Sequence, residues 1–429
     1  MGEELRLLSI PPPIHAEDPV SPPPESILID VYGHLNDRIN DTTAEGFTRD
    51  GKRIQISFWA AEPPRISCFT VRCPDLKHNP FGSMPKILST EDDLVLLRVP
   101  ICPGNGHQDA RNNDYFVYQA GTKNKPPSLR LIPTSPPFFS DRQVVILRCR
   151  DQDMFFLTVA RNRPFTEKQF DLHVYNSKTE RWGARSIHVD SPNFDYEYAH
   201  KVTTIGGELG SVGWVDLWRG ILIYDVLLDN NSLRYIPLPP PALPRCGLPK
   251  LVRNIVVLHG CIKFFQLTQG WEAATMKMDI SDIGSGNKWE DEFRINFLDV
   301  PVSRVAYAQM LDGPNHLQEG EDKEPNLASL CPFSPALSLH DDAIVYVMSK
   351  HNYMEDTALV IALDMGNRTL EGMAYFCSGR CVIPYGSTYI QSGISKHLGI
   401  WSSTRNGVNA AETNRDVAAS SDEVSEGVI

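Results

Sequence analysis

A few short stretches of this chain hold residue types that could do chemistry. One is the run Gly-Gly-Glu-Leu-Gly-Ser-Val-Gly over residues 206–213, which superficially resembles a phosphate-binding loop. It lacks the Lys-Ser/Thr ending of such loops. The segment after it predicts a strand, whereas phosphate loops lead into a helix whose N-terminus attracts the anion. We therefore interpret these glycines as turn residues that lead into a strand.

The run His-Asp-Asp at residues 340–342 offers side chains that could bind a metal ion or transfer protons. Contiguous residues at the start of a strand point to alternate sides, so the three side chains do not converge on one point. The run is also similar to Glu-Asp-Asp at residues 91–93, and each run precedes an apolar strand. We interpret both runs as one type of turn that recurs.

The nine cysteines are scattered along the chain and form no dense disulfide framework. The pairs Cys68/Cys73 and Cys377/Cys381 are too widely spaced for a CxxC metal site, and no pair of histidines accompanies them. We expect buried free thiols in a reducing compartment. No nucleophile elbow or metalloprotease helix occurs, so we predict no catalytic residue, no cofactor and no metal site.

The most distinctive group of side chains is Trp214, Asp216, Trp218 and Arg219. Alternation along a strand places Trp214, Asp216 and Trp218 on one side, with the two intervening apolar residues on the other. Our interpretation is structural: the tryptophans pack between sheets, and Asp216 accepts hydrogen bonds from turn amides or from Arg219. The alternative is that these four residues contact a ligand.

The elements that would position these residues are short strands. From residue 27 to about residue 398, apolar or alternating runs are separated by polar turns, which is typical of β-structure. One unit recurs: an apolar strand, a closing residue, a short turn and another strand. Successive closing residues are 47 to 56 residues apart, except for a last gap of 85. They are Cys73, Ala120, Asn176, Asp225, Asp279 and Asp364.

A period of about 50 residues is typical of the blades of a kelch-type β-propeller. A four-stranded sheet cannot bury both of its faces alone, but sheets arranged radially cover one another. The sequence therefore predicts an all-β, kelch-like β-propeller with six blades of four-stranded antiparallel sheets. A β-sandwich or two unrelated β domains are the alternatives. We expect residues 27–31 to pair with residues 389–392, because an unclosed ring leaves sheet edges that aggregate.

The strongest motif is Gly-Trp-Val-Asp-Leu-Trp-Arg-Gly-Ile-Leu-Ile-Tyr-Asp-Val at residues 213–226, followed by Ser-Leu-Arg-Tyr-Ile-Pro-Leu-Pro at 232–239. It resembles the signature of the plant domain-of-unknown-function family 1618, relatives of which show kelch-like, F-box-associated patterns. The resemblance covers residues 200–300 best. It implies a β-propeller and supplies no catalytic residues.

Composition limits the partners and the location that we expect. The net charge of −12 disfavours a broad nucleic-acid surface, which needs clustered Lys and Arg. We see no signal peptide and no apolar run long enough to span a bilayer, so we expect a soluble cytoplasmic or nuclear protein without a membrane partner. We expect a Pro-rich flexible leader over residues 1–25, the propeller over 26–400 with an acidic loop insertion at 312–326, and a disordered acidic tail over 401–429.

These observations favour a non-enzymatic, monomeric protein-interaction scaffold whose loops bind a protein partner. The acidic insertion and tail would suit a basic partner. One alternative is a propeller enzyme or small-ligand binder with a polar site in the central channel; a pocket lined by several carboxylates, His or Arg in mutual contact would favour it. A further alternative, a substrate adaptor in ubiquitination, follows only from the resemblance to F-box-associated domains, and the proline-rich leader leaves no room for an F-box.

Overall fold

The computed structural model of the chain contains β-strands and short 3-10 helices, and no α-helix occurs among the residues it describes. None of the helices in that part of the chain is long and apolar enough to cross a membrane. The described residues are 23–401 without the segments 77–80, 82, 102–112, 134–139, 164–165, 167, 242–246, 269–271, 285, 303–326, 328–331, 350–356 and 378–388. Most of the predicted leader, the acidic loop at 312–326 and nearly all of the acidic tail lie outside the described residues.

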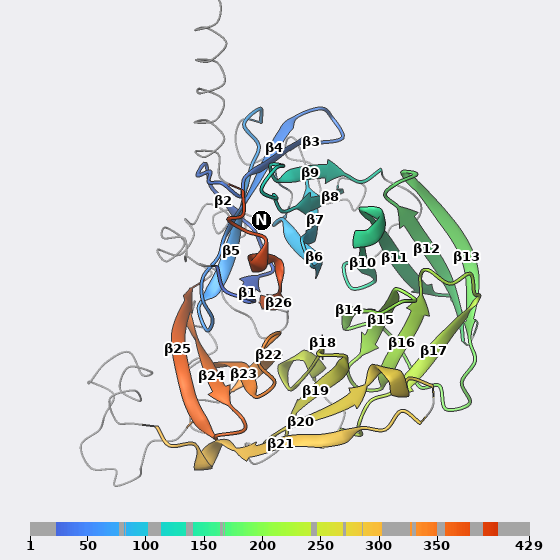
Figure 1. Cartoon of the computed structure of the whole chain (residues 1–429), viewed down its shortest axis with the longest axis vertical. Helices are drawn as coiled ribbons and strands as arrows, with labels where there is room; N and C mark the ends of the chain where they lie inside the picture. Colours follow the sequence, from blue (N-terminus) through green and yellow to red (C-terminus); the bar gives the residue numbers. More distant parts are fainter. Residues whose placement is uncertain are drawn as a thin grey trace, which may run out of the picture.

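The strands form groups of neighbours that are antiparallel except for the pairings of β5 with β1 and β2 in the first group, and these groups lie in a ring (Figure 1). In the first group β26 (Tyr389–Ser392) is innermost, followed outward by β1 (Ile27–Asp30), β5 (Ile66–Arg72), β4 (Arg53–Trp59) and β3 (Ala44–Phe47), with β2 (His34–Leu35) beside β5. This arrangement confirms that the fold is all-β and propeller-like.

The other groups run outward in chain order. The second is β6 (Lys86–Glu91), β7 (Leu94–Pro100), β8 (Asn113–Gln119) and β9 (Ser128–Leu131). The third is β10 (Val144–Cys149), β11 (Met154–Asn162), β12 (Gln169–Asn176) and β13 (Arg181–Val189), and the fourth is β14 (Lys201–Gly206), β15 (Ser211–Asp216), β16 (Gly220–Asp225) and β17 (Ser232–Pro237). The last two are β18 (Arg253–Leu258), β19 (Cys261–Leu267), β20 (Glu272–Asp279) and β21 (Glu290–Asn296), then β22 (Phe333–Leu337), β23 (Ile344–Ser349), β24 (Thr357–Asp364) and β25 (Thr369–Cys377). A short parallel pairing of β13 with β17 joins the third and fourth groups at their outer edges.

Burial explains why some strands are apolar throughout and others are largely polar. All six residues of β16, a middle strand, are buried, whereas most residues of the outer strand β13 are exposed. A strand covered on both faces is apolar throughout. The middle strands therefore appear in the sequence as continuous apolar runs.

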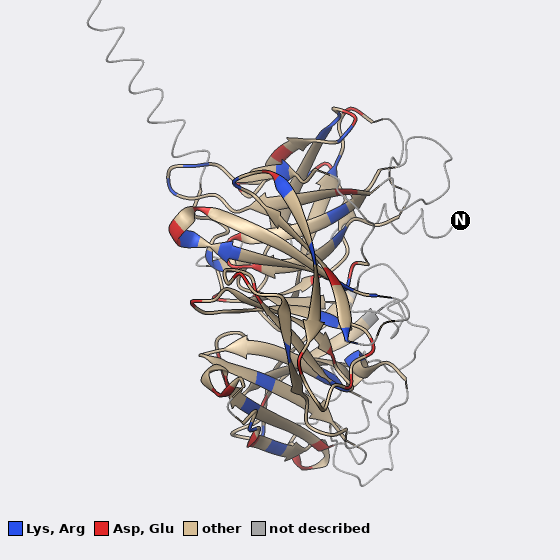
Figure 2. Cartoon of the chain, turned by 90° about the vertical axis from the view of Figure 1, so that its right-hand side faces the viewer, with Lys and Arg blue, Asp and Glu red and all other residues tan. Residues whose placement is uncertain are grey.

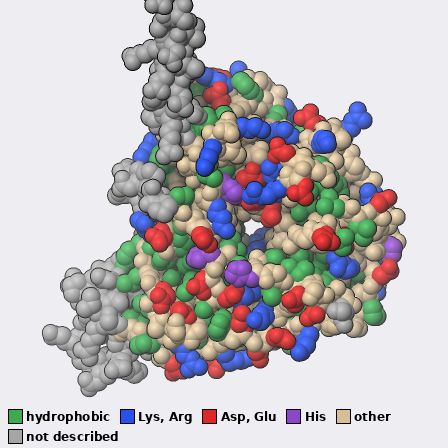
Figure 3. All heavy atoms as spheres, in the orientation of Figure 1, with side chains coloured by type: hydrophobic (Ala, Val, Ile, Leu, Met, Phe, Trp, Pro, Cys, Tyr) green, Lys and Arg blue, Asp and Glu red, His purple; other side chains and the backbone are tan. Residues whose placement is uncertain are grey.

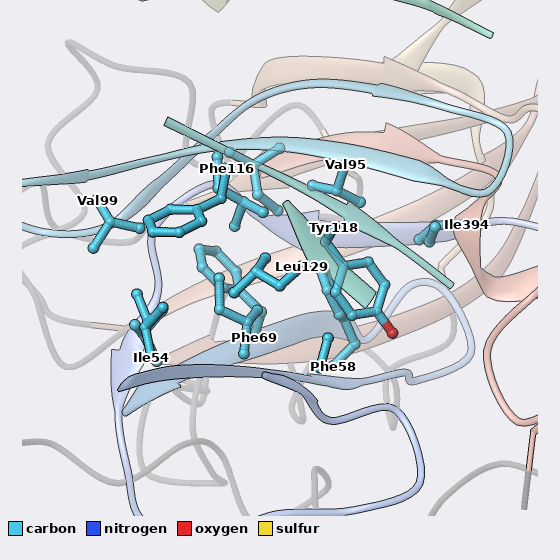
Figure 4. Close-up of a cluster of buried hydrophobic side chains, with 14 of the residues drawn as sticks. Ile54, Phe58, Phe69, Val95, Val99, Phe116, Tyr118, Leu129 and Ile394 are labelled. Atoms are coloured by element: carbon cyan, nitrogen blue, oxygen red, sulfur yellow. The ribbon is translucent and has the colours of Figure 1, made fainter. Parts of the chain in front are cut away.

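Apolar clusters fill the spaces between neighbouring groups. Between the first and second groups, Phe58 and Phe69 pack against Phe116 and Tyr118 (Figure 4). Further clusters lie in the same way between each of the following neighbours. Another joins the last group, through residues such as Met348, to Leu28 of the first. Every sheet is thus covered on both faces, and the packing runs around the whole ring.

The two ends of the described chain meet in one sheet. β1 pairs with β26 in antiparallel register, with Ile27 opposite Ser392 and Asp30 opposite Tyr389. This confirms the predicted pairing of residues 27–31 with residues 389–392. The ring is therefore closed by main-chain hydrogen bonds as well as by side-chain packing.

The spacing of the closing residues is also explained. Each of them ends, or directly follows, the third strand of its group counted outward from the channel: β5, β8, β12, β16, β20 or β24. Within the described residues, the long gap between Asp279 and Asp364 contains β21 to β24 and no additional group of strands.

We expect that Gly220→Ala destabilises the protein by about 1–3 kcal/mol, the usual cost of forcing extra atoms into a packed interior. A Cβ atom at Gly220 would lie 2.5 Å from the carbonyl oxygen of Ile236 and would also clash with the ring of Tyr235. Gly286→Ala is the matched control, because its Cβ would meet no atom within 4 Å. Thermal unfolding followed by circular dichroism compares the two variants, and equal melting temperatures would contradict the described packing around β16.

Candidate functional site

The centre of the ring is a channel of about 730 Å³, lined by the inner strands and the residues that flank them. Cavities of roughly 300–1,000 Å³ are typical of small-ligand sites. Figure 3 shows the opening, with basic, acidic and histidine side chains around it. On the side of the molecule shown in Figure 2, basic and acidic residues are interspersed along the strands and turns. The channel is therefore the candidate site.

One mouth of the channel is basic, and the topology explains why. The inner strands β6, β10, β14 and β18 start at the same end of the channel, because the strands of each of these groups follow one another outward in the same order. Lys86 and Lys201 are the first residues of β6 and β14, while Arg142 and Lys250 lie just before β10 and β18. These four cations and Asp141, which all line the channel, form what we call the basic mouth.

The one carboxylate of the basic mouth is already shared by two cations. Oδ2 of Asp141 lies 3.0 Å from Nζ of Lys86, and Oδ1 lies 3.1 Å from Nη1 of Arg98. Nζ of Lys86 also lies 5.6 Å from the ring centroid of Tyr32. Asp141 therefore offsets the charge of its immediate neighbours and leaves the rest of the mouth positive.

Lys201 is held in place by neutral groups. Its Nζ donates to Oδ1 of Asn254 at 2.8 Å and to the carbonyl oxygen of Ile255 at 2.7 Å. Burial lowers the pKa of Lys201 to about 8, because a cation loses hydration in the channel wall. Two fixed acceptors orient the ammonium group without cancelling its charge.

Lys250 lies on the short helix η4 (Pro249–Leu251), and its pKa is lowered further than that of Lys201. Burial first, and then the neighbouring charges of Arg142, Lys86 and Lys201, lower its pKa to about 7. Burial and the like charges both disfavour the protonated form, so a further positive charge is unfavourable at this mouth. An anion placed between these groups would relieve the repulsion.

The other mouth, formed by the ends of the inner strands, is balanced. Arg148 lies 2.9 Å from Asp93, and Arg150 pairs with Asp92. Asp92 also lies 2.9 Å from Nε2 of His397. The hydrogen bonds and charges of Arg150 and His397 outweigh burial, which alone would raise the pKa of Asp92, and hold that pKa well below its usual range. Arg148, Arg150 and His397 therefore each have a carboxylate partner, whereas the described partners of Lys201 at the basic mouth are neutral.

The residues that the sequence singled out lie directly behind the basic mouth. Nε1 of Trp214 donates to the carbonyl oxygen of Gln143 at 2.6 Å, and Gln143 belongs to the turn that carries Asp141 and Arg142. Lys201 on β14 pairs with Val215 on β15. The signature therefore braces two of the segments that form the mouth, although sequence reasoning identified none of the mouth's own side chains.

Asp216 is fully buried and organises the turn after β15. Its carboxylate accepts hydrogen bonds from the amides of Glu197 at 3.1 Å and Trp218 at 3.0 Å, and it lies 3.4 Å from Nδ1 of His200. Burial would raise the pKa of Asp216, but the bonds from His200 and the two amides outweigh it and lower the pKa. The predicted role of Asp216 as an acceptor of turn amides is confirmed.

Arg219 is neutralised rather than presented to a ligand. Its guanidinium lies 3.2 Å from Asp216, 3.0 Å from Asp195 and 2.7 Å from Glu197. The predicted contact between Arg219 and Asp216 is confirmed, and the group forms a local network behind the channel wall.

Both tryptophans of the signature are buried, as predicted, but Trp218 is placed differently from Trp214. β15 ends at Asp216, so Trp218 lies in a turn where strand alternation no longer applies. Its ring lies 5.5 Å from the guanidinium of Arg253, on the neighbouring strand β18, whereas Trp214 packs toward the β10–β13 group. The prediction that the two tryptophans share one side was wrong, because the strand is shorter than the motif.

The glycine run forms a turn, as predicted. Gly206 ends β14, Gly207 and Gly210 lie in the turn before β15, and their φ angles of +78°, +73° and +58° favour glycine. The side chains of residues 340–342 diverge: His340 contacts Ser26, and Asp342 contacts Lys263. Within the described residues, no group of His, Cys, Asp or Glu is arranged to hold a metal ion.

The family model described as "Protein of unknown function (DUF1618)" matches residues 214–346. Residues 214–346 therefore belong to the DUF1618 family. Its matched segment begins at Trp214 and includes Asp216, Trp218 and Arg219, together with Lys250 of the basic mouth. Among the curated proteins, none matches the chain.

Several solved structures are similar to the chain at low identity. AofleA from Arthrobotrys oligospora is 9% identical with a TM-score of 0.36, over 86% of this chain and 88% of its own. The SapL1 lectin in complex with alpha methyl fucoside is 11% identical with a TM-score of 0.33, over 83% of this chain and 96% of its own. The C-terminal WD40 domain of Sif2 is 9% identical with a TM-score of 0.33, over 83% of this chain and 75% of its own. The strand pairings, and not these similarities, define the fold of this DUF1618 protein.

We expect that Trp214→Ala lowers the free energy of unfolding by about 3–5 kcal/mol, the usual range for a core aromatic. The ring is 1% exposed and its Nε1 holds the turn before β10. Trp214→Phe keeps most of the packing and loses the hydrogen bond, so it should lower the free energy of unfolding by less than Trp214→Ala does. Urea unfolding at one pH measures both. A Trp214→Ala protein as stable as the wild type would show that the signature has no structural role.

We expect that Lys250→Gln raises the free energy of unfolding at pH 6 by about 1–2 kcal/mol, which allows for screening of the half-buried site. Between the folded pKa of about 7 and the ordinary value of 10.5, the unfolded chain binds more protons than the folded one. The gain is therefore fully present below pH 7 and disappears as the pH rises toward about 10.5. Lys178→Gln, on an exposed turn, is the control. A gain that does not depend on pH would contradict the charge repulsion described for the mouth.

Proposed function

We propose that this DUF1618 protein is a non-enzymatic interaction scaffold that binds a protein partner through the basic mouth of its channel. The observation that carries the proposal is the convergence of Lys86, Arg142, Lys201 and Lys250 at one end of the channel. Complementary charge gives an interface specificity and raises the rate of association. The group that the partner inserts is therefore acidic.

The proposal includes a finer description of the fold: a kelch-like propeller with six blades. The grouping of the strands and the clusters between neighbouring groups support it. The period of the closing residues, 47 to 56 residues over most of the chain, also supports it. A rigid ring of this kind holds side chains from different blades in a fixed relation.

The composition of the mouth supports binding rather than catalysis. Its described side chains are cations and one carboxylate, and that carboxylate is engaged by Lys86 and Arg98. Asp216 and His200, which do lie together, are both buried, with 0% and 2% of their surface exposed, although His200 is among the residues that line the channel. General acid–base catalysis needs proton donors and acceptors within reach of a substrate, which this arrangement does not favour.

The test is to compare partners captured by the wild-type chain with those captured by the double variant Arg142→Glu/Lys250→Glu. We expect the double variant to lose specific partners at least about tenfold in abundance, because reversing a charge at an interface costs several kcal/mol. The double variant Lys178→Glu/Arg181→Glu, on an exposed outer turn, makes the same change in net charge as a control.

Affinity purification with quantitative mass spectrometry gives the readout, and circular dichroism melting checks that both double variants are folded. If the mouth variant and the outer-turn variant capture the same proteins in the same amounts as the wild type, the partner does not bind through the basic mouth.

A second candidate function is a small-ligand binder or an enzyme that uses the channel itself. The channel volume and the pKa of about 7 at Lys250 favour it, because a lysine with such a pKa can accept a proton near neutral pH. A metabolite found in the channel by native mass spectrometry, and lost in the Arg142→Glu/Lys250→Glu variant, would favour this candidate over the scaffold.

A further inference from the structure

We infer that the basic mouth is a binding site for a phosphate monoester, the doubly charged group carried by phosphorylated side chains and by small phosphorylated metabolites. The inference deepens the proposed function and depends on the mouth being the binding surface. Four features of the mouth carry it: where its cations come from, how they are held, how they repel one another, and what an anion would restore.

The first feature is convergence. Lys86, Arg142, Lys201 and Lys250 come from four consecutive groups of strands, and each stands at or just before the start of an inner strand. Their backbones are fixed by the sheets, since Lys201 is paired with Val215 and the turn of Arg142 is held by Trp214. A site built from rigid elements binds its ligand without the cost of ordering loops.

The second feature is charge that the protein itself does not cancel. Asp141 serves Lys86 and Arg98, and the hydrogen-bond acceptors of Lys201 are an amide oxygen and a main-chain carbonyl. At the opposite mouth, by contrast, Arg148 and Arg150 each face carboxylates. Among the described residues, the arginines of one mouth therefore face carboxylates, whereas Lys201 of the other mouth faces neutral acceptors and keeps its full charge.

The third feature decides the class of anion. A carboxylate carries one negative charge and two acceptor oxygens, whereas a phosphate monoester carries about −1.5 to −2 at neutral pH and has three acceptor oxygens. The charges of three neighbours, Arg142, Lys86 and Lys201, all lower the pKa of Lys250, after burial. A compact dianion with three oxygens can contact cations from several blades at once, and lysines are common ligands of phosphate.

The fourth feature is a proton that moves with the ligand. Several polar groups stand around Lys250 or line the same part of the channel: Lys86 with Asp141 and Tyr32, Arg142, Lys201 with Asn254, and the buried His200, whose Nε2 has no hydrogen-bond partner in the described part of the structure. The cations lower the pKa of Lys250 to about 7, and a bound dianion would raise it again. Phosphate binding at pH 7.5 should therefore take up a proton.

The experiment is isothermal titration calorimetry of the full chain with three probes: inorganic phosphate, O-phosphoserine and glutamate. We expect both phosphates to bind at least about tenfold more tightly than glutamate, because each additional charge-assisted hydrogen bond adds about a factor of ten. Titration in two buffers of different ionisation enthalpy should give net proton uptake. Tight binding of phosphoserine but not of inorganic phosphate would indicate a phosphorylated side chain as the natural ligand, and the reverse would indicate a small metabolite.

Variants separate a binding role from a structural one. Lys201→Gln and Lys250→Gln should each weaken O-phosphoserine binding by about tenfold or more, since each removes one charge-assisted bond, and Lys250→Gln should also abolish the proton uptake. Asp141→Asn should tighten binding, because it removes the one carboxylate of the mouth and releases Lys86. Lys178→Gln should change nothing. No binding of either phosphate, or weaker binding by Asp141→Asn in a protein that melts normally, would overturn the inference.

Failure of this inference can be told apart from failure of the proposed function. If Arg142→Glu/Lys250→Glu loses protein partners but O-phosphoserine binds no better than glutamate, the mouth is a protein-binding surface for carboxylates. If both experiments are negative, the mouth is not the binding surface at all.

Discussion

The interaction on which this structure depends is the burial of both faces of every sheet. Middle strands such as β16 are apolar on each side, so a single sheet would expose an apolar face to water at about 25 cal/mol per Å². The neighbouring sheets on either side supply the cover, and the same requirement passes to the next sheet until the ring closes. Closure is therefore a condition for stability, and the pairing of β1 with β26 fulfils it. The channel is a consequence, because sheets packed in a ring leave a space where their inner edges face one another.

The polar side chains that line the channel lie where the packing of the sheets stops, at the inner strand ends. The starts of β6 and β14 carry lysines whose side chains leave the sheet and enter the channel. Behind them, the residues that define the DUF1618 signature form a buried support: Trp214 holds the turn before β10, and Asp216 and Arg219 hold the turn after β15. The buried residues of the signature thus lie next to the proposed binding site without forming part of it.

The fold could be predicted from the sequence because its cause is local and repeated. A period near 50 residues, continuous apolar middle strands and complementary strands at the two ends each leave a direct trace in the residue pattern. The basic mouth left no such trace. Its cations are single residues, with Lys86 and Lys201 more than a hundred positions apart, and nothing in the sequence shows that Asp141 serves two of the basic residues while Lys201 faces neutral groups. The error over Trp218 has a related origin, because where a strand ends depends on tertiary hydrogen bonds such as those of Asp216.

The seam between β1 and β26 has a consequence for how the protein is made. A ribosome completes β1 near the beginning of synthesis and β26 only after the other groups of strands, so the first sheet waits for its innermost strand until almost the whole ring has emerged. During that interval the edge of β1 is a row of unpaired amide and carbonyl groups, which is a template for wrong strand pairing. Nascent chains that terminate early would keep this open edge permanently. A chain that lacks only its last strand therefore exposes an edge that pairs readily with other strands.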